Sequence, residues 1–317
     1  MFRRCILAFG FAFFASFPIA CGLPAVAFEI GIDRSNLTRQ PLAVQEKTMQ
    51  GIAALGATWF RDGIGGDDPE ATDGLVNEVR LAKKYNLKFL AVVSRRISDY
   101  PEGYRPANAG PEFRQLCGWG QGAAPYSEVD LARFSRRFQA QLTAVKSRGL
   151  TIDAFEIGNE VNLMCFNGDV PNGHAASPEE YQRLLRGYAR FLKTAATIIR
   201  DKRNFPGAKI ITFGIAHGGS TANPNPHFIA DPARIIADLK NLDGFNYLDN
   251  QFYRVDGYGS HLYPPARDIT GHMEARQEVR LKQAEAAKYK RLTETRSLNQ
   301  PAAIIGFIRG GVHRESA

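Results

Sequence analysis

Cysteine is scarce in this 317-residue chain, and the metal-binding patterns built on it are missing. Of the four cysteines, Cys5 and Cys21 lie near the N-terminus, and only Cys117 and Cys165 follow them. Two distant thiols are too few for a zinc site, and no CxxC or HExxH pattern occurs. We therefore expect no bound metal, and the two later cysteines are compatible with one disulfide in an oxidising compartment.

Two further signals are missing: a phosphate-binding glycine loop and a basic stripe. No G-x-G-x-x-G follows the first extended run, and "GIGGDD" at 63–68 lacks the required spacing, so no cofactor is expected. The formal net charge is +8, but its lysines and arginines are spread along helical segments such as "RFSRRF" (133–138) without aromatics suited to stacking on bases. This distribution indicates a solvated basic surface, and we expect no nucleic-acid partner.

Long apolar runs are confined to the first 27 residues. Arg3 and Arg4 precede an apolar core, and "AVA" ends at Ala27, which is typical of a cleavable signal peptide. A membrane anchor and a lipid-modified start at Cys21 are the competing interpretations; Pro18 disfavours the second, because such sites normally carry an aliphatic residue there. We expect a secreted or periplasmic protein without a membrane segment after cleavage, and the sequence leaves its oligomeric state open.

Seven extended apolar runs alternate with helical segments between residues 28 and 308, and residues 309–317 form an irregular tail. The runs are 27–33, 57–63, 87–93, 152–158, 208–216, 255–263 and 302–308. Continuous apolar strands that alternate with helices indicate a parallel sheet covered by helices. Polar residues gather where these runs end, which is where a (β/α)₈ barrel places its chemistry. We therefore predict one α/β barrel domain rather than a doubly wound sheet.

Glu160 ends the fourth run, "FEIGNE" (155–160). Partial desolvation at a strand end raises the pKa of a carboxyl group into the range of a general acid. Strand alternation places Glu156, Gly158 and Glu160 on one face, with Glu156 deeper and suited to a buried ion pair with Arg61. Taken alone, Glu160 is also compatible with a capping or loop carboxylate.

Three strand ends together resemble the glycoside hydrolase clan A barrels, which include family 5 cellulase-like and family 39 xylosidase-like enzymes. These are "WFRDG" (59–63), "EIGNE" (156–160) and "SHLYP" (260–264). The resemblance implies retaining hydrolysis of O-glycosidic bonds in an oligo- or polysaccharide, with Glu160 as the acid/base. It implies a contact of Asn159 with the sugar 2-hydroxyl, and places Arg61, His261 and Tyr263 around the substrate.

The loops at the predicted barrel mouth supply further candidates. Trp119 follows the third strand and offers an aromatic face to a sugar, although such residues are more often packing. His217 ends the fifth strand and is a further substrate-binding candidate. Cys117 and Cys165 lie in the loops after strands three and four, which are neighbours on a barrel's rim, so a disulfide between them would brace the mouth.

The nucleophile that the resemblance requires is missing. Clan A enzymes carry it as a Glu at the end of strand seven, but "QPAAIIGFIRGG" (300–311) contains no carboxylate. We expect an incomplete barrel of about six and a half βα units, truncated by an early stop or a frameshift near residue 301, or else a divergent strand in a pseudoenzyme. Both hypotheses predict little activity, and truncation also predicts unpaired edges on strands one and seven.

Two other functions are alternatives to an impaired glycosidase. A non-catalytic carbohydrate-binding protein would keep the cleft without the chemistry. A metal-dependent sugar isomerase would use Glu156, Glu160, His217 and His261, but strands five to seven offer only histidine as a ligand. The substrate sugar, its linkage and endo or exo action stay open.

Overall fold

The computed structural model describes most of the chain up to residue 261 and one later strand. The described residues are 29–64, 66, 68–170, 176–216, 219–220, 223–224, 229–230, 232–242, 255–261 and 305–309. The predicted signal peptide and two predicted site residues, His217 and Tyr263, lie outside them. Among the described helices, none has the length and apolar character needed to cross a bilayer.

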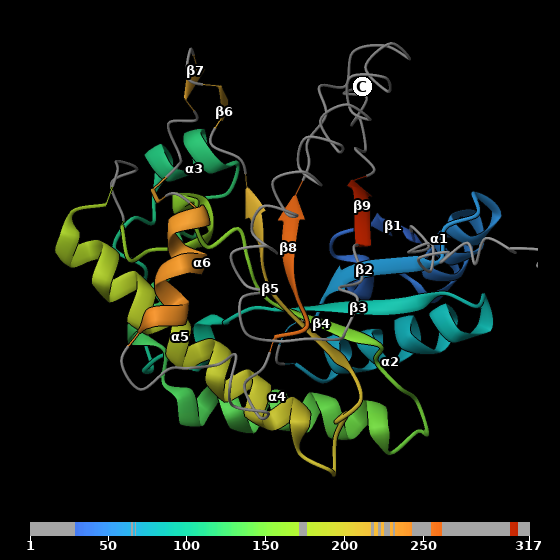
Figure 1. The fold of residues 1–317 in the computed structure, drawn as a ribbon. Coiled ribbons are helices and arrows are strands. Elements are labelled where there is room, and N and C mark those ends of the chain that lie inside the picture. Colours follow the sequence, from blue (N-terminus) through green and yellow to red (C-terminus); the bar gives the residue numbers. More distant parts are fainter. Residues whose placement is uncertain are drawn as a thin grey trace, which may run out of the picture.

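Seven parallel strands form one curved sheet in the order β8-β5-β4-β3-β2-β1-β9 (Figure 1). The prediction of a parallel α/β sheet is confirmed, and most runs end within a residue or two of the observed strands. The strands are β1 (Glu29–Asp33), β2 (Trp59–Gly63), β3 (Lys88–Val93), β4 (Ala154–Asn159), β5 (Lys209–Ala216), β8 (Gly257–His261) and β9 (Ile305–Arg309).

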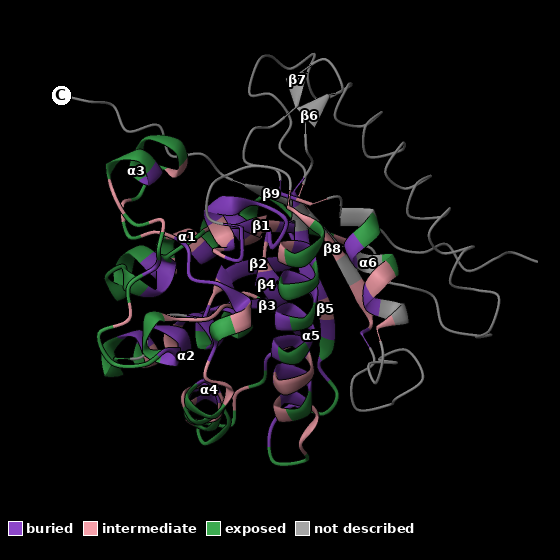
Figure 2. Ribbon diagram, turned by 90° about the vertical axis from the view of Figure 1, so that its left-hand side faces the viewer, coloured by how far each residue is buried: buried purple, intermediate pink, exposed green. Residues whose placement is uncertain are grey.

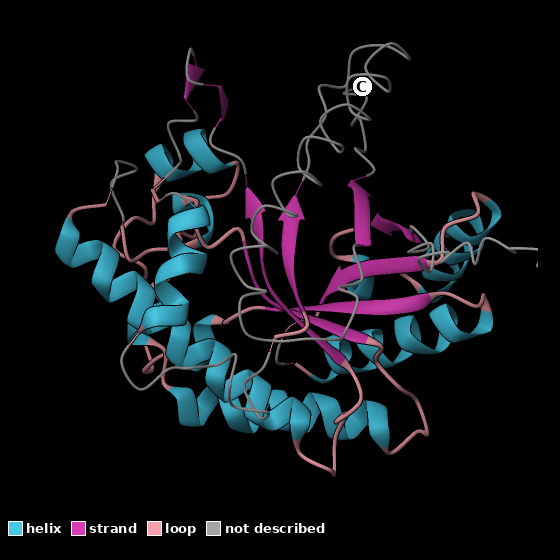
Figure 3. Ribbon diagram, in the orientation of Figure 1, coloured by secondary structure: helices cyan, strands magenta, loops and turns pink. Residues whose placement is uncertain are grey.

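The long helices form one layer around the outside of the sheet (Figures 1 and 3). Each packs against the next along the chain. They are α1 (Leu42–Ala54), α2 (Pro69–Lys84), α4 (Leu131–Lys146), α5 (Pro178–Arg200) and α6 (Pro232–Asn241). A doubly wound sheet carries helices on both faces, whereas a barrel carries them only outside. The described architecture is therefore a partial α/β barrel.

Local sequence decides where two of these helices begin. The Asp68 side chain accepts a hydrogen bond from the Ala71 amide at 2.6 Å and caps α2. Before α5, the Ser177 hydroxyl accepts from the Glu180 amide at 3.2 Å, and the Glu180 carboxylate accepts from the Ser177 amide at 2.9 Å. This reciprocal capping box satisfies amides that the first helical turn leaves without partners.

The two faces of the sheet have different interiors. The main core lies between the sheet and the helices, and Figure 2 shows the buried strands behind helices whose outer sides are exposed. A smaller cluster of Trp59, Leu90, Ala154 and Ile211 lies on the inner face. Side chains two residues further along a strand return to the same face, and there Arg61 and Glu156 replace apolar groups. The inner face therefore changes from apolar to charged toward the strand carboxyl ends.

The expectation of an unpaired edge on the first strand is wrong. β9 pairs with β1 over five residues, from Glu29 opposite Ile305 to Asp33 opposite Arg309. The run expected as strand seven thus lies beside strand one, the place that the last strand takes in a closed barrel. This pairing satisfies backbone groups that β1 would otherwise leave exposed. Within the described residues, β8 and β9 are the edge strands of the sheet.

The loops at the strand carboxyl ends contain short elements that the sequence did not predict. The connection from β3 to α4 holds η2 (Ile97–Asp99), α3 (Pro111–Cys117) and η3 (Tyr126–Glu128), and η4 (Met164–Phe166) follows β4. The remaining short elements are η1 (Leu37–Arg39), β6 (Gly219–Ser220) and β7 (Asn223–Pro224). These segments give the rim of the partial barrel its own ordered structure.

Candidate active site

Arg61 organises the charged interior of the partial barrel. Its Nε and Nη2 atoms donate to the two carboxylate oxygens of Glu156 at 3.1 and 2.7 Å, so the predicted ion pair is present. Nη1 donates to Asp33 Oδ1 at 3.0 Å, and Nη2 also donates to Asn159 Oδ1 at 2.9 Å. One guanidinium on β2 therefore links β1 and β4, and its planar set of donors bonds acceptor atoms of three residues.

The cluster is ionised although it is buried. Burial alone would raise the pKa of Glu156, but the positive charge of Arg61 and the contact with His261 outweigh it and lower that pKa to about 2. Burial likewise opposes the charge of Arg61, yet Glu156 and Asp33 raise the pKa of the guanidinium above its ordinary value. Each charge is thus stabilised by its partners rather than by water.

Glu160 lies just beyond the end of β4 with a nearly buried side chain. Its Oε1 atom is 2.8 Å from His261 Nδ1, and its amide donates to the Gly214 carbonyl at 3.1 Å. His261 ends β8 and Gly214 lies in β5. Three neighbouring strands therefore bring together a carboxyl group and an imidazole, two groups that commonly act in proton transfer.

The prediction that Glu156, Gly158 and Glu160 share one face is wrong for Gly158, whereas the side chains of Glu156 and Glu160 both contact His261. Gly158 has φ 87° and Glu160 has φ 43°, and both angles break the two-residue alternation of a strand. A Cβ at Gly158 would lie 2.9 Å from the Tyr126 hydroxyl and 3.3 Å from a ring carbon of Tyr188 on α5, so this position faces the helical layer. Glycine adopts such a φ without strain, and the turn directs Asn159 toward Arg61.

His261 bridges the two carboxylates of the site. Its Nε2 atom is 3.3 Å from Glu156 Oε1, while Nδ1 faces Glu160. Arg61 Nη2 lies 3.0 Å from Nε2, but both Nη2 hydrogens already bond Glu156 and Asn159, so Nε2 carries a hydrogen directed at Glu156. Burial lowers the pKa of His261, but Glu156 outweighs this effect and leaves that pKa raised.

Close backbone packing makes room for this imidazole. Gly214 in β5 lies opposite Gly259 in β8, and a Cβ added at Gly214 would overlap the His261 ring. A Cβ at Gly259 would lie 2.8 Å from the Gly214 backbone. The two glycines therefore allow β5 and β8 to place His261 against Glu156 and Glu160.

A disulfide and an aromatic group occupy the rim. Cys117 at the end of α3 is bonded to Cys165 in η4, with 5.5 Å between their Cα atoms. Trp119 is 38% exposed, and its ring centroid lies 6.1 Å from that of Phe113 and 5.4 Å from that of Phe166. The loops after β3 and β4 are thus joined covalently beside a partly exposed tryptophan.

Arg95, two residues after β3, holds the same two loops together. Its Nε donates to the Ala124 carbonyl at 2.7 Å and its Nη2 to the Phe166 carbonyl at 2.6 Å. The guanidinium carbon lies 3.9 Å from the centroid of the Tyr126 ring. This ring lies under Gly158, so Arg95 supports the turn that presents Asn159 and Glu160.

The structure brings together Arg61, Asn159, Glu160 and His261, and it adds Asp33, which the sequence analysis missed. Asp33 ends the first strand as Glu160 follows the fourth, so its position was the available signal. Trp119 lies on the rim, outside the hydrogen-bonded cluster. Across the described parts of the chain, no group of three or more His, Cys, Asp and Glu side chains is arranged to hold a metal ion.

No known family profile matches the chain, and no curated protein matches it. Several solved structures resemble parts of the chain, among them glycosidases. A fungal β-1,4-galactanase has a TM-score of 0.45 and 18% identity, over 74% of this chain and 64% of its own. A D-allulose 3-epimerase from Methylomonas sp. has a TM-score of 0.31 and 17% identity, over 58% and 51%. A β-glucosidase from Exiguobacterium marinum has a TM-score of 0.37 and 12% identity, over 69% and 53%.

The chain therefore spans less than two thirds of the length of each of these three structures.

Proposed function

We propose that this protein binds an oligo- or polysaccharide at the strand carboxyl ends, with Glu160 as the proton donor to a glycosidic oxygen. The observation that carries the proposal is the 2.8 Å contact between Glu160 and His261 beside the Arg61–Glu156 pair. A general acid needs a partner that orients it, and His261 Nδ1, 2.8 Å from Glu160 Oε1, holds this carboxyl group in place. The apolar leader of residues 1–27 supports export to a compartment where such saccharides occur.

Asn159 is the proposed contact to the sugar. Its Oδ1 atom accepts from Arg61 at 2.9 Å, which supports the orientation of the NH₂ group as a hydrogen-bond donor to a sugar hydroxyl. Arg61 is itself fixed by Asp33 and Glu156, so the amide is held without free rotation. A pre-oriented donor beside the acid is what recognition of a hydroxyl group requires.

We further propose that hydrolysis is severely impaired. Retaining hydrolysis needs a second carboxyl group about 5–5.5 Å from the acid, acting as nucleophile. Residues 300–311, where the family resemblance places the nucleophile, contain no Asp or Glu. Glu156 is a poor substitute, because both of its oxygens accept hydrogen bonds from Arg61. Because these hydrogen bonds engage both oxygens, Glu156 is also poorly suited to bind a metal ion as in an isomerase.

Chemical rescue tests this proposal. Aryl β-glycosides of several sugars are incubated with the protein, with and without sodium azide. Azide attacks the anomeric carbon as the aryl oxygen leaves with the Glu160 proton, which yields a phenol and a glycosyl azide of inverted configuration. We expect slow release of the phenol without azide and a large increase in the rate with azide. In Glu160→Gln, the rate with azide should fall by about 10²–10⁴-fold, which is the usual contribution of a general acid.

Glu112→Gln serves as the matched control, because Glu112 is an exposed carboxylate of α3 on the rim. Rapid turnover without azide would contradict the impaired mechanism and point to a surrogate nucleophile. Oligosaccharide binding by calorimetry without any azide effect would favour the non-catalytic binding protein. Absence of both would reject the carbohydrate site.

A further inference from the structure

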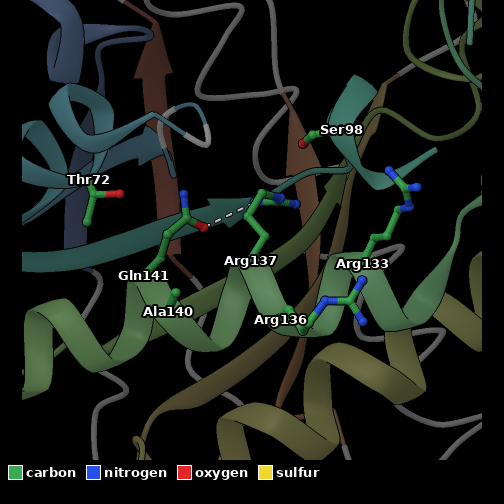
Figure 4. A pocket seen from close by; sticks show the side chains of 7 residues that line it. All are labelled: Thr72, Ser98, Arg133, Arg136, Arg137, Ala140 and Gln141. Atoms are coloured by element: carbon green, nitrogen blue, oxygen red, sulfur yellow. Dashed lines mark hydrogen bonds between the residues drawn. The ribbon is translucent and has the colours of Figure 1, made fainter. Parts of the chain in front are cut away.

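A hollow lies among the outer helices, between α4, the first turns of α2, and η2 (Figure 4). Its volume is about 330 Å³, at the lower end of the roughly 300–1,000 Å³ typical of small-molecule sites. The lining residues are Thr72, Ser98, Arg133, Arg136, Arg137, Ala140 and Gln141. None of them belongs to the Arg61–Glu160 site, so this hollow is a separate feature.

The lining contains three arginines and no acidic residue. Arg137 is held by hydrogen bonds within the protein, because its Nε and Nη2 atoms donate to the two oxygens of buried Asp99 at 2.8 and 2.7 Å. Its Nη1 donates to Gln141 Oε1 at 3.0 Å, and Gln141 Nε2 donates to the Gly66 carbonyl at 2.9 Å. Arg137 and Gln141 thus form a rigid wall.

Arg133 and Arg136 are different, because both side chains are exposed. Arg133 lies 3.4 Å from Asp130 in a surface pair whose two side chains are each about two-fifths exposed. Such a pair contributes little to stability, so a ligand can replace it. Arg136 is three residues further on, about one turn along α4, and both side chains line the hollow (Figure 4). Ser98 and Thr72 add hydroxyl groups to the lining of the hollow.

We propose that this hollow binds a small molecule carrying a phosphate or sulfate group, held by Arg133 and Arg136. Guanidinium groups donate paired hydrogen bonds to tetrahedral oxyanions, and a lining without carboxylates does not repel them. The volume leaves space for more than the oxyanion, such as an attached sugar ring. The "RFSRRF" segment, which the sequence assigns to a solvated surface, thereby acquires a binding role.

Isothermal titration of the full chain with inorganic phosphate, sulfate and a hexose phosphate tests the proposal, with sodium chloride keeping ionic strength constant. We expect saturable binding that weakens by about tenfold or more in Arg133→Gln/Arg136→Gln, the loss expected when charge-assisted bonds are removed. Arg186→Gln is the control, because Arg186 is an exposed arginine of α5 outside the hollow; it should change binding by less than about twofold.

Thermal melts without anion check that the variants fold, and Arg136→Gln alone provides a milder change. Tighter binding of the hexose phosphate than of inorganic phosphate would support a phosphorylated saccharide, and equal binding would support the oxyanion alone. Binding that persists unchanged in the double variant, or that chloride reproduces at equal ionic strength, would overturn the proposal. Neutral hexose should not bind here, so the result is independent of the catalytic proposal.

Discussion

At the scale of single residues, the buried carboxyl pair of Asp62 and Glu78 is a costly feature of the fold. Glu78 on α2 is fully buried, as is Asp62 on β2. Asp62 accepts backbone hydrogen bonds from Asn36, Leu37 and Gly63, at 2.9, 2.7 and 2.6 Å. Burial, and then the charge of Asp62, raise the pKa of Glu78 well above its usual range. Glu78 therefore keeps its proton and shares it with Asp62.

Replacing Glu78 with Gln should flatten the pH dependence of stability. A carboxyl group whose pKa is raised by folding stabilises the protein fully below its unfolded pKa, near 4.5, and loses this contribution as pH rises through the folded value. Wild type should therefore lose free energy of unfolding as pH rises above about 4.5, and Glu78→Gln should lose less. Urea denaturation across this range measures both slopes. Glu102→Gln, in an exposed loop, should follow wild type; equal slopes for Glu78→Gln would contradict the shared proton.

Several site residues were predictable because each stands where an apolar run ends. Arg61, Glu160 and His261 meet because the carboxyl ends of parallel strands converge at one edge of the sheet. The faces were predicted less well. Alternation assumes an extended strand, but Gly158 adopts a left-handed φ. Glycine can adopt such an angle without strain, yet many glycines do not, so the residue type alone does not predict it. The contacts of Tyr126 and Tyr188, far away in sequence, decide this angle.

At the scale of elements, strand positions and the order of the first six strands followed from sequence, but the place of the last strand did not. Continuous apolar runs mark buried parallel strands wherever they lie in the sheet, so 302–308 was recognised as a strand. Its pairing with β1 rather than with β8 depends on how the sheet curves, which no local pattern encodes. The short helix α3 was missed because a seven-residue helix inside a loop rich in Gly and Pro has little periodicity.

The disulfide should stabilise the rim elements by a measurable amount. Cys117 and Cys165 are 48 residues apart, and closing a loop of this length contributes about 4 kcal/mol in the chain-entropy estimate. Reduction with dithiothreitol, or the Cys117→Ala/Cys165→Ala variant, should lower the melting temperature by several degrees or more. Calorimetry measures the shift, and mass labelling of thiols verifies reduction.

The double alanine variant is also the control for this experiment, since its melting temperature should not respond to dithiothreitol. A wild-type chain with fully labelled Cys117 and Cys165 and an unchanged melting temperature would show that the bond does not constrain folding. Loss of stability on reduction in the double variant as well would assign the effect to the reagent.

At the scale of the whole molecule, the Arg61 cluster acts as a charged centre inside the sheet. It joins Asp33 of β1 and Glu156 and Asn159 of β4 to one cation on β2, and Glu156 in turn contacts His261 of β8. The strands on both sides of the sheet's centre are therefore held through side chains as well as through backbone pairing. An arrangement of this kind makes global stability sensitive to the ionisation of one carboxylate, because each buried charge depends on its partner.

Acid should consequently weaken the whole fold through Glu156. Folding lowers its pKa from 4.5 to about 2, so its stabilising contribution is present above pH 4.5 and is lost as pH falls toward 2. Arg61→Met leaves this carboxylate buried without its cation and should cost about 3–5 kcal/mol at neutral pH. Arg61→Met/Glu156→Gln removes both charges, so it should recover part of that loss and lack the steep acid dependence. Urea denaturation at several pH values distinguishes the three proteins. If Arg61→Met matched wild type at neutral pH, the cluster would be dispensable, and the partial barrel would depend on its helix-facing core alone.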